Sequence, residues 1–237
     1  MRAVRIVVSV MLWVLVLGMS SIPASIGNMR SLTASSSWLS GGTAIQLTIL
    51  TVSLAVILCL SKGKLGRYGF RRSARTQIKE AFVFGSISAV TIHVLLAILR
   101  TVFPSSGDLP AVADSSFVHV VVSVWILASI SEEILHRGLI QSYLDPLREH
   151  GVNLLNIRLS IPVLVAALLF GLMHIMLLTT GADAHLVGGI VGSAVVLGIV
   201  AGYYREKSGS ILPAILVHML FNVYGGAAQH IQQLVMK

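Results

Sequence analysis

The sequence predicts an all-α fold: a polytopic transmembrane helical bundle with about seven spans and a cytoplasmic N-terminus. Apolar residues make up 55% of the 237 residues, only 11% are charged, and the mean hydropathy is +0.88. A soluble domain carries about 25% charged residues, so this chain lacks the polar surface that contact with water on all sides requires. Its apolar residues form long continuous runs, and its basic residues gather between alternate runs.

Seven of these runs are long enough to cross a bilayer as helices. A hydrocarbon core about 30 Å thick requires roughly 20 apolar residues per helix. The runs that approach this length are residues 4–22, 42–61, 81–103, 116–143, 161–180, 186–204 and 211–235. Barrel strands alternate apolar and polar residues, whereas these runs are continuously apolar. The sequence therefore predicts helices rather than strands in the membrane.

The distribution of charge predicts the orientation. With a cytoplasmic N-terminus, the inner loops hold most of the basic residues: Arg2, Arg5, the block from Lys62 to Lys79, Arg148, Arg158, Arg205 and Lys207. The outer loops hold Arg30 and Lys237, beside Asp108, Asp114 and Asp183. This asymmetry follows the positive-inside rule. We interpret the net charge of +8 as a topology signal that also contacts anionic headgroups, and we expect no nucleic-acid partner.

The first run has a second interpretation, as a signal peptide. Basic residues precede it, and Ser21-Ile22-Pro23-Ala24 follows its apolar part. That segment makes a poor cleavage site, so we expect a retained helix. The single cysteine, Cys59, excludes an intramolecular disulfide, and we expect it to be a small packing residue.

Ionisable side chains divide the single membrane domain, residues 1–237, into two parts. Helices within residues 1–115 carry few polar side chains and are expected to support the others. Helices within residues 116–237 carry carboxylates, imidazoles and an amide inside apolar runs. Intramembrane ionisable groups are costly and usually face a cavity or one another. We therefore expect the second part to hold the functional site.

Glycines in the sixth run form two small-xxx-small pairs. Gly188 pairs with Gly192, and Gly198 pairs with Gly202. Such pairs let helix backbones approach closely. Both pairs therefore predict tight packing inside the bundle.

Three motifs carry the polar residues of the second part. In Glu132-Glu133-xxx-Arg137, the i,i+4 spacing puts Glu133 and Arg137 on one helix face, where they are expected to pair. Glu132 points about 100° away and lacks a cation on its own turn, unless His136 at i+4 supplies one. The other two motifs are Phe170-xxx-His174 and His218-xxx-Asn222. Taken singly, each motif also has a structural explanation, as a buried ion pair or an interhelical hydrogen bond.

Their depth in the membrane brings the motifs together. At 1.5 Å per residue, Glu132, His174 and Asn222 lie roughly 17–20 Å from the cytoplasmic ends of their helices, and His218 roughly 11 Å. Such a cluster requires water or a metal to satisfy its polar atoms. A carboxylate and imidazoles around a water form a general-base and oxyanion site suited to hydrolysis.

In this order on successive helices, the three motifs resemble the CPBP (Abi) family of intramembrane proteases, over roughly residues 116–225. That family includes the type II CAAX prenyl endopeptidases and bacteriocin self-immunity proteins. The resemblance implies a multi-pass protein of the cell membrane. Its partners would be the lipid bilayer and a membrane-associated peptide or protein that it cleaves, with or without a prenyl group.

The resemblance also implies roles for single residues. Glu132 would activate the attacking water, assisted by His174, and His218 would help to stabilise the oxyanion. These three side chains are also adequate ligands for a divalent metal such as zinc. Family members have been described both with and without a catalytic metal. No His-Glu-x-x-His helix is present, so the sequence leaves the cofactor open.

The remaining motif residues would complete the site. Asn222 would share the stabilisation of the oxyanion, and Glu133 with Arg137 would hold the geometry, with a more direct part for Glu133 left open. Two other functions stay open beside an endopeptidase. One is a noncatalytic membrane protein for bacteriocin self-immunity or partner binding. The other is a proton-coupled transporter, which the lack of inverted repeats disfavours.

Overall fold

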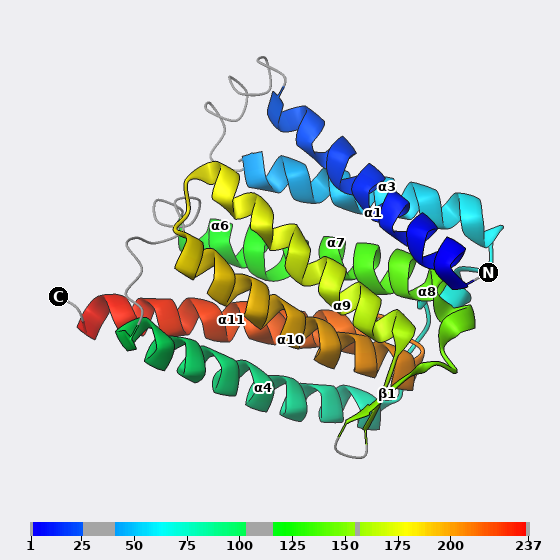
Figure 1. The fold of residues 1–237 in the computed structure, drawn as a ribbon. Coiled ribbons are helices and arrows are strands. Elements are labelled where there is room, and N and C mark those ends of the chain that lie inside the picture. Colours follow the sequence, from blue (N-terminus) through cyan, green and yellow to red (C-terminus); the bar gives the residue numbers. More distant parts are fainter. Residues whose placement is uncertain (1, 26–40, 103–115, 155–156, 236–237) are drawn as a thin grey trace.

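The computed structural model describes residues 2–25, 41–102, 116–154 and 157–235, and they form a bundle of long helices (Figure 1). The helices run alternately in opposite directions, so their ends gather at two ends of the bundle. The long elements are α1 (Arg2–Ser25), α3 (Gly41–Ser61), α4 (Arg75–Val102), the helix Phe117–Tyr143, α9 (Ile161–Met173), α10 (Ala184–Ser208) and α11 (Leu212–Val235). Short 3-10 helices follow α3, the helix Phe117–Tyr143 and α9: η1 (Leu65–Tyr68), η4 (Asp145–Leu147) and η5 (His174–Thr180).

The prediction of an all-α polytopic bundle is confirmed. Within the described residues, six helices are long and apolar enough to cross a membrane: Arg2–Ile22, Gly41–Ser61, Arg75–Val102, Phe117–Tyr143, Ile161–Thr180 and Ala184–Ser208. Each coincides with one of the first six apolar runs. The seventh run forms α11, which packs along α4 and α10 but is not among these six. The chain is therefore an integral membrane protein.

A small β-hairpin was not predicted. Strands β1 (Gly151–Leu154) and β2 (Ile157–Ser160) pair antiparallel between the fourth and fifth spans. A side chain at Gly151 would meet the Leu159 carbonyl oxygen at 2.1 Å, so this strand pair needs glycine there. The hairpin is too short for a residue pattern to indicate it.

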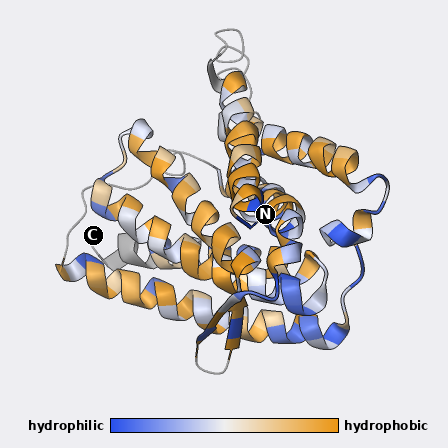
Figure 2. Cartoon of the chain, turned by 45° about the vertical axis from the view of Figure 1, so that its right-hand side comes forward, coloured by the Kyte–Doolittle hydropathy of each residue, from blue (hydrophilic) through white to orange (hydrophobic). Residues whose placement is uncertain are grey.

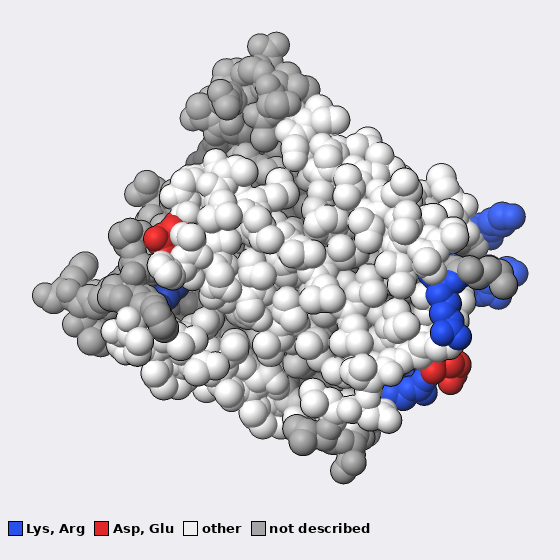
Figure 3. Space-filling view, in the orientation of Figure 1, with Lys and Arg blue, Asp and Glu red and all other residues white. Residues whose placement is uncertain are grey.

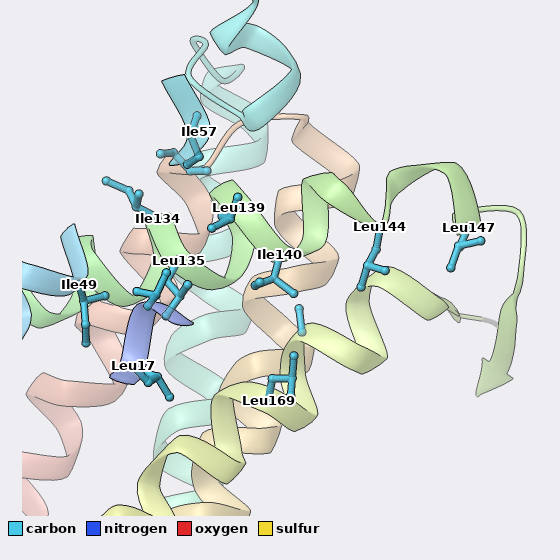
Figure 4. Close-up of a cluster of buried hydrophobic side chains, with 13 residues drawn as sticks. Leu17, Ile49, Ile57, Ile134, Leu135, Leu139, Ile140, Leu144, Leu147 and Leu169 are labelled. Atoms are coloured by element: carbon cyan, nitrogen blue, oxygen red, sulfur yellow. The ribbon is translucent and has the colours of Figure 1, made fainter. Parts of the chain in front are cut away.

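Helix α1 is packed into the bundle. Val16 is fully buried, and Leu17 joins a large apolar cluster with residues of α3, α9 and the fourth span (Figure 4). Trp13 and Arg5 also donate hydrogen bonds to the fourth span. These contacts join α1 to the fourth span, and the expectation that this helix is retained stays a prediction. Cys59, in contrast, is exposed on α3, so its prediction as a packing residue is wrong.

The two glycine pairs of α10 differ. A Cβ at Gly198 would meet Ala167 Cα at 2.8 Å, and one at Gly202 would meet Val163 Cγ1 at 3.1 Å, so the predicted close approach to α9 is confirmed. Gly188 and Gly192 have no atom of the described residues within 4 Å of such a Cβ, and tight packing is wrong there. They face a cavity of about 520 Å³ between α4 and α10.

The two ends of the bundle differ in charge. The helices are mostly apolar, and hydrophilic segments gather near the N-terminus (Figure 2). Most of the Lys and Arg side chains seen in Figure 3 lie at this end, which we call the basic end. There Arg71 donates to the Gly209 carbonyl at 2.7 Å, and Arg205 donates to the Arg67 carbonyl at 3.2 Å. These bonds fasten the segment after α3 to the last turn of α10 and to Gly209 directly after it.

Candidate active site

The fourth span changes its helical type on both sides of the two glutamates. It consists of α6 (Phe117–His119), the π-helical η2 (Val120–Ala128), α7 (Ser129–Glu133), the π-helical η3 (Ile134–Ile140) and α8 (Gln141–Tyr143). In a π-helical turn the hydrogen bonds run from i to i+5, and such turns are frequent at functional sites. The sequence predicted an uninterrupted α-helix here. Segment α7, which carries Glu132 and Glu133, thus lies between two widened stretches of helix.

Glu133 and Arg137 form the predicted ion pair. Arg137 Nη1 donates to Glu133 Oε1 at 2.9 Å, and both side chains are fully buried. Arg137 Nη2 also donates to the Gly198 carbonyl of α10 at 2.9 Å. The same Glu133 oxygen accepts from His218 Nδ1 at 2.9 Å. One carboxylate therefore ties the fourth span to α11 and orients the His218 ring, since the proton on Nδ1 is committed to it.

Glu132 has a different set of neighbours. Its Oε1 accepts a hydrogen bond from Gln46 Nε2 of α3 at 2.6 Å. Its Oε2 lies 3.8 Å from His218 Nε2, which is beyond a direct hydrogen bond. No Lys or Arg of the described residues forms an ion pair with this carboxylate. Glu132 is therefore oriented by a neutral donor and keeps one oxygen directed at an imidazole.

His136 does not supply the cation that was considered for Glu132. Its Nδ1 donates to the backbone carbonyl of Glu132 at 2.8 Å, so Nε2 is left to accept. Trp13 of α1 donates its indole N–H to that Nε2 at 3.1 Å. With both nitrogens engaged, the ring joins α1 to the fourth span and makes no bond with the Glu132 carboxylate.

His174 stands at the end of α9, where the helix tightens into η5. Its Nδ1 donates to the Phe170 carbonyl one turn back at 3.0 Å, which leaves Nε2 as an acceptor. The Phe170 ring makes edge contacts with three imidazoles, those of His136, His174 and His218. The Arg137 guanidinium lies 4.9 Å from the centroid of this ring. Phe170 therefore spaces the polar groups of the site and fixes the planes of their rings.

Asn222 joins α11 to the fourth span. Its Nδ2 donates to the Val124 carbonyl and to Ser129 Oγ, each at 3.0 Å. Val124 belongs to the π-helical η2, and Ser129 in turn donates to the Trp125 carbonyl at 2.7 Å. The two amide hydrogens that Asn222 possesses are thus both used in holding this segment.

A cavity of about 700 Å³ joins these residues. Four of the predicted site residues line it: Glu132, His174, His218 and Asn222. The fully buried pair of Glu133 and Arg137 does not line it and lies directly behind. The cavity continues along the first six residues of α3, the last ten of α4 and the first half of α10. These segments lie toward the end of the bundle opposite the basic end (Figure 1), so the cavity extends from Glu132 in that direction.

The conditional metal ligands do not form a metal centre. Within the described parts of the chain, no three His, Cys, Asp or Glu side chains lie close enough together to hold an ion. Glu132 and His218 approach each other, but His174 does not complete a set with them. We therefore derive no step of the reaction through a metal.

Several neighbours of the site were missed in the sequence. Gln46 contacts Glu132, and Trp13 contacts His136, although both belong to the part expected only to support the site. His93 of α4 lines the cavity and donates from Nδ1 to the Ala89 carbonyl at 2.7 Å. The available signal was an isolated polar side chain within an apolar run, which in a membrane helix usually faces a partner.

Residues 114–224 match the model of a family described as type II CAAX prenyl endopeptidase Rce1-like. Over these residues, which make up just under half of the chain, the protein is similar to the Rce1-like family. The match confirms the resemblance to CPBP proteases and covers all three motifs, while α1, α3 and α4 lie outside it. No curated protein and no solved structure matches the chain. The Rce1-like segment thus contributes every lining histidine except His93, together with both glutamates.

Proposed function

We propose that this protein is a CAAX-type intramembrane endopeptidase that hydrolyses a peptide bond of a membrane-associated peptide or protein. One observation carries the proposal: the Glu132 carboxylate, held by a neutral donor, lines a cavity among membrane-spanning helices together with His174 and His218. The cavity provides the water-sized space that hydrolysis requires inside an apolar bundle. The match of residues 114–224, which include these three residues, to the Rce1-like family model supports the proposal.

In the proposed reaction Glu132 acts as the general base. Its Oε2 takes a proton from a water in the cavity as the water oxygen attacks the carbonyl carbon of the substrate. His174 accepts a hydrogen bond from the same water through Nε2. The proton then passes from Glu132 to the departing amine nitrogen as the C–N bond breaks. General catalysis of this kind contributes about 10²–10⁴-fold to a rate.

The developing oxyanion requires a donor on the opposite side of the carbonyl. His218, when protonated, donates from Nε2 while Nδ1 stays bonded to Glu133. Both amide hydrogens of Asn222 are engaged, with Val124 and Ser129. Asn222 can therefore stabilise the oxyanion only if one of these two hydrogen bonds breaks. We therefore propose that His218 is the main hydrogen-bond donor to the oxyanion. Glu133 and Arg137 would hold the His218 ring in position.

The test compares wild type with Glu132→Gln, both purified and reconstituted in liposomes. A quenched membrane-peptide library serves as substrate, with and without a chelator. We expect Glu132→Gln to lose cleavage by about 10²–10⁴-fold. Glu149→Gln is the matched control, since the Glu149 side chain is 84% exposed and outside the cavity, and it should cleave as wild type does.

Equal cleavage by both proteins would rule out Glu132 as the base. If neither folded protein cleaves any peptide, the noncatalytic alternative, partner binding or bacteriocin self-immunity, replaces the endopeptidase. The chelator arm addresses the cofactor. Loss of wild-type activity that zinc restores would add a metal to the site.

We also propose that the basic end is cytoplasmic, as the positive-inside rule predicts. The cavity then extends toward the non-cytoplasmic side, and the substrate segment approaches from there. In a Cys59→Ser chain, a membrane-impermeant maleimide should label Ala228→Cys, which replaces a cavity-lining residue, in intact cells. Lys64→Cys at the basic end should be labelled only after permeabilisation. The reverse pattern would invert the proposed orientation.

A further inference from the structure

Helix α3 sends one polar side chain into the active-site cavity. Gln46 is the only amide or charged side chain among the residues of α3, Gly41–Ser61. It lines the cavity beside Glu132, although it lies outside the Rce1-like match and 86 positions from Glu132 in the sequence. A lone amide in an apolar membrane helix is costly unless it bonds to a partner. The question is therefore what its contacts accomplish.

The amide of Gln46 is oriented from both of its ends. Nε2 donates to Glu132 Oε1 at 2.6 Å, and Oε1 accepts from the hydroxyl of Ser131, the residue before Glu132. A carboxylate only accepts hydrogen bonds, so the nitrogen of the amide must face it. Ser131 is fully buried and also contacts the Ala128 carbonyl. The Glu132 carboxylate thus fixes the direction of the amide, and the Ser131 hydroxyl anchors its oxygen.

These contacts make the two carboxylate oxygens of Glu132 different, and they leave only Oε2 without a hydrogen bond from Gln46. Oε1 is held by Gln46, and Oε2 is directed at His218 Nε2 at 3.8 Å. A cationic partner would hold the carboxylate equally well but would neutralise its charge, as Arg137 does for Glu133. A neutral amide fixes the position and leaves the charge available to a proton.

We propose that Gln46 is a positioning residue of the reaction, which holds Glu132 so that Oε2 meets the attacking water. The inference rests on the proposed endopeptidase function and extends the active site to a helix outside the family match. Gln46 acts through Glu132 and transfers no proton itself. Its loss therefore affects the chemical step more than the binding of substrate.

Gln141 offers a matched control of the same residue type. It is also buried in the bundle, and its Nε2 donates to the Gly202 carbonyl at 2.9 Å. It does not line the cavity. Replacement by Met at either position removes the amide and keeps most of the side-chain length.

The experiment measures kcat, KM and thermal unfolding of the full chain in liposomes for wild type, Gln46→Met, Gln141→Met and Glu132→Gln. We expect Gln46→Met to lower kcat by about 100-fold, the cost of a catalytic group displaced by about 1 Å, with KM within about twofold of wild type. Gln141→Met should lower the unfolding temperature and leave kcat unchanged. Ser131→Ala, a smaller change that frees the Gln46 amide, should lower kcat by several-fold and serves if Gln46→Met does not fold.

The outcomes separate this inference from the proposed function. If wild type cleaves, Glu132→Gln does not, and Gln46→Met or Ser131→Ala keeps the wild-type kcat, the positioning role is wrong and the endopeptidase stands. A fall in kcat matched by an equal loss at Gln141→Met would make Gln46 a structural residue only. A wild type that cleaves nothing overturns both proposals.

Discussion

The bundle consists of two unlike halves, whose boundary runs between two adjacent glutamates. The half at the basic end is filled: Leu135, Leu139 and Ile140 of the fourth span and Leu144 directly after it are fully buried. The other half contains the cavity of about 700 Å³, which begins at Glu132. We call them the filled half and the cavity half. Their difference shows that one apolar composition can build both a tightly packed core and a hollow one into which a few polar side chains project.

The two carboxylates follow this division. Glu133 faces the filled half, where desolvation calls for a countercharge and hydrogen bonds. Arg137 and His218 both bond to its Oε1, while its Oε2 has no hydrogen-bond partner among the described residues. Glu132 faces the cavity half, where a neutral amide suffices because water can reach the carboxylate. Neighbours in the sequence thereby acquire different surroundings, and the proposed function gives a chemical task only to Glu132.

The largest loss of stability is expected from breaking the ion pair of Glu133 and Arg137, which lies at the boundary between the two halves. Arg137→Met leaves Glu133 buried without a cation and removes the bond to the Gly198 carbonyl. Breaking a buried pair in this way costs about 3–5 kcal/mol. The free energy of unfolding in detergent, measured by denaturant titration, should fall by that amount.

Arg148→Met is the control for this prediction. Arg148 also contacts a carboxylate, that of Glu206, but the Arg148 side chain is 49% exposed. Its loss should cost no more than about 1 kcal/mol. Similar losses for both variants would show that the boundary pair is not desolvated as described, and the contrast between the halves would weaken.

A smaller loss of unfolding free energy is expected when glycines of α10 are replaced. This helix runs through both halves. Gly198→Ala forces a Cβ against Ala167 of α9 and should cost about 1–3 kcal/mol of unfolding free energy. Gly192→Ala meets no atom of the described residues and should be neutral, or stabilising by up to about 1 kcal/mol through helix propensity. Equal losses at the two positions would mean that the space beside Gly192 is filled in the membrane.

The sequence was sufficient for the spans and for part of the site. Long apolar runs have one inexpensive conformation in a bilayer, the helix, because every backbone polar group must be paired internally. The ion pair of Glu133 and Arg137 was also predictable, since i,i+4 spacing on a helix brings side chains together. The β-hairpin had no such signal, because its pairing depends on a close approach at Gly151 that composition does not reveal.

Only the tertiary structure decided the contacts between helices that are distant in the sequence. The hydrogen bond from Gln46 to Glu132, the one from Trp13 to His136 and the engagement of Asn222 with a π-helical segment all join residues far apart in the chain. Periodicity determines which face of a helix is polar, but it does not determine which helix covers that face. The chain by itself therefore determined that ionisable groups lie in helices able to span a membrane, and their depth stays a prediction. The packing of seven helices decided which glutamate became buried against arginine and which one faces the cavity, because desolvation depends on neighbours from the whole fold.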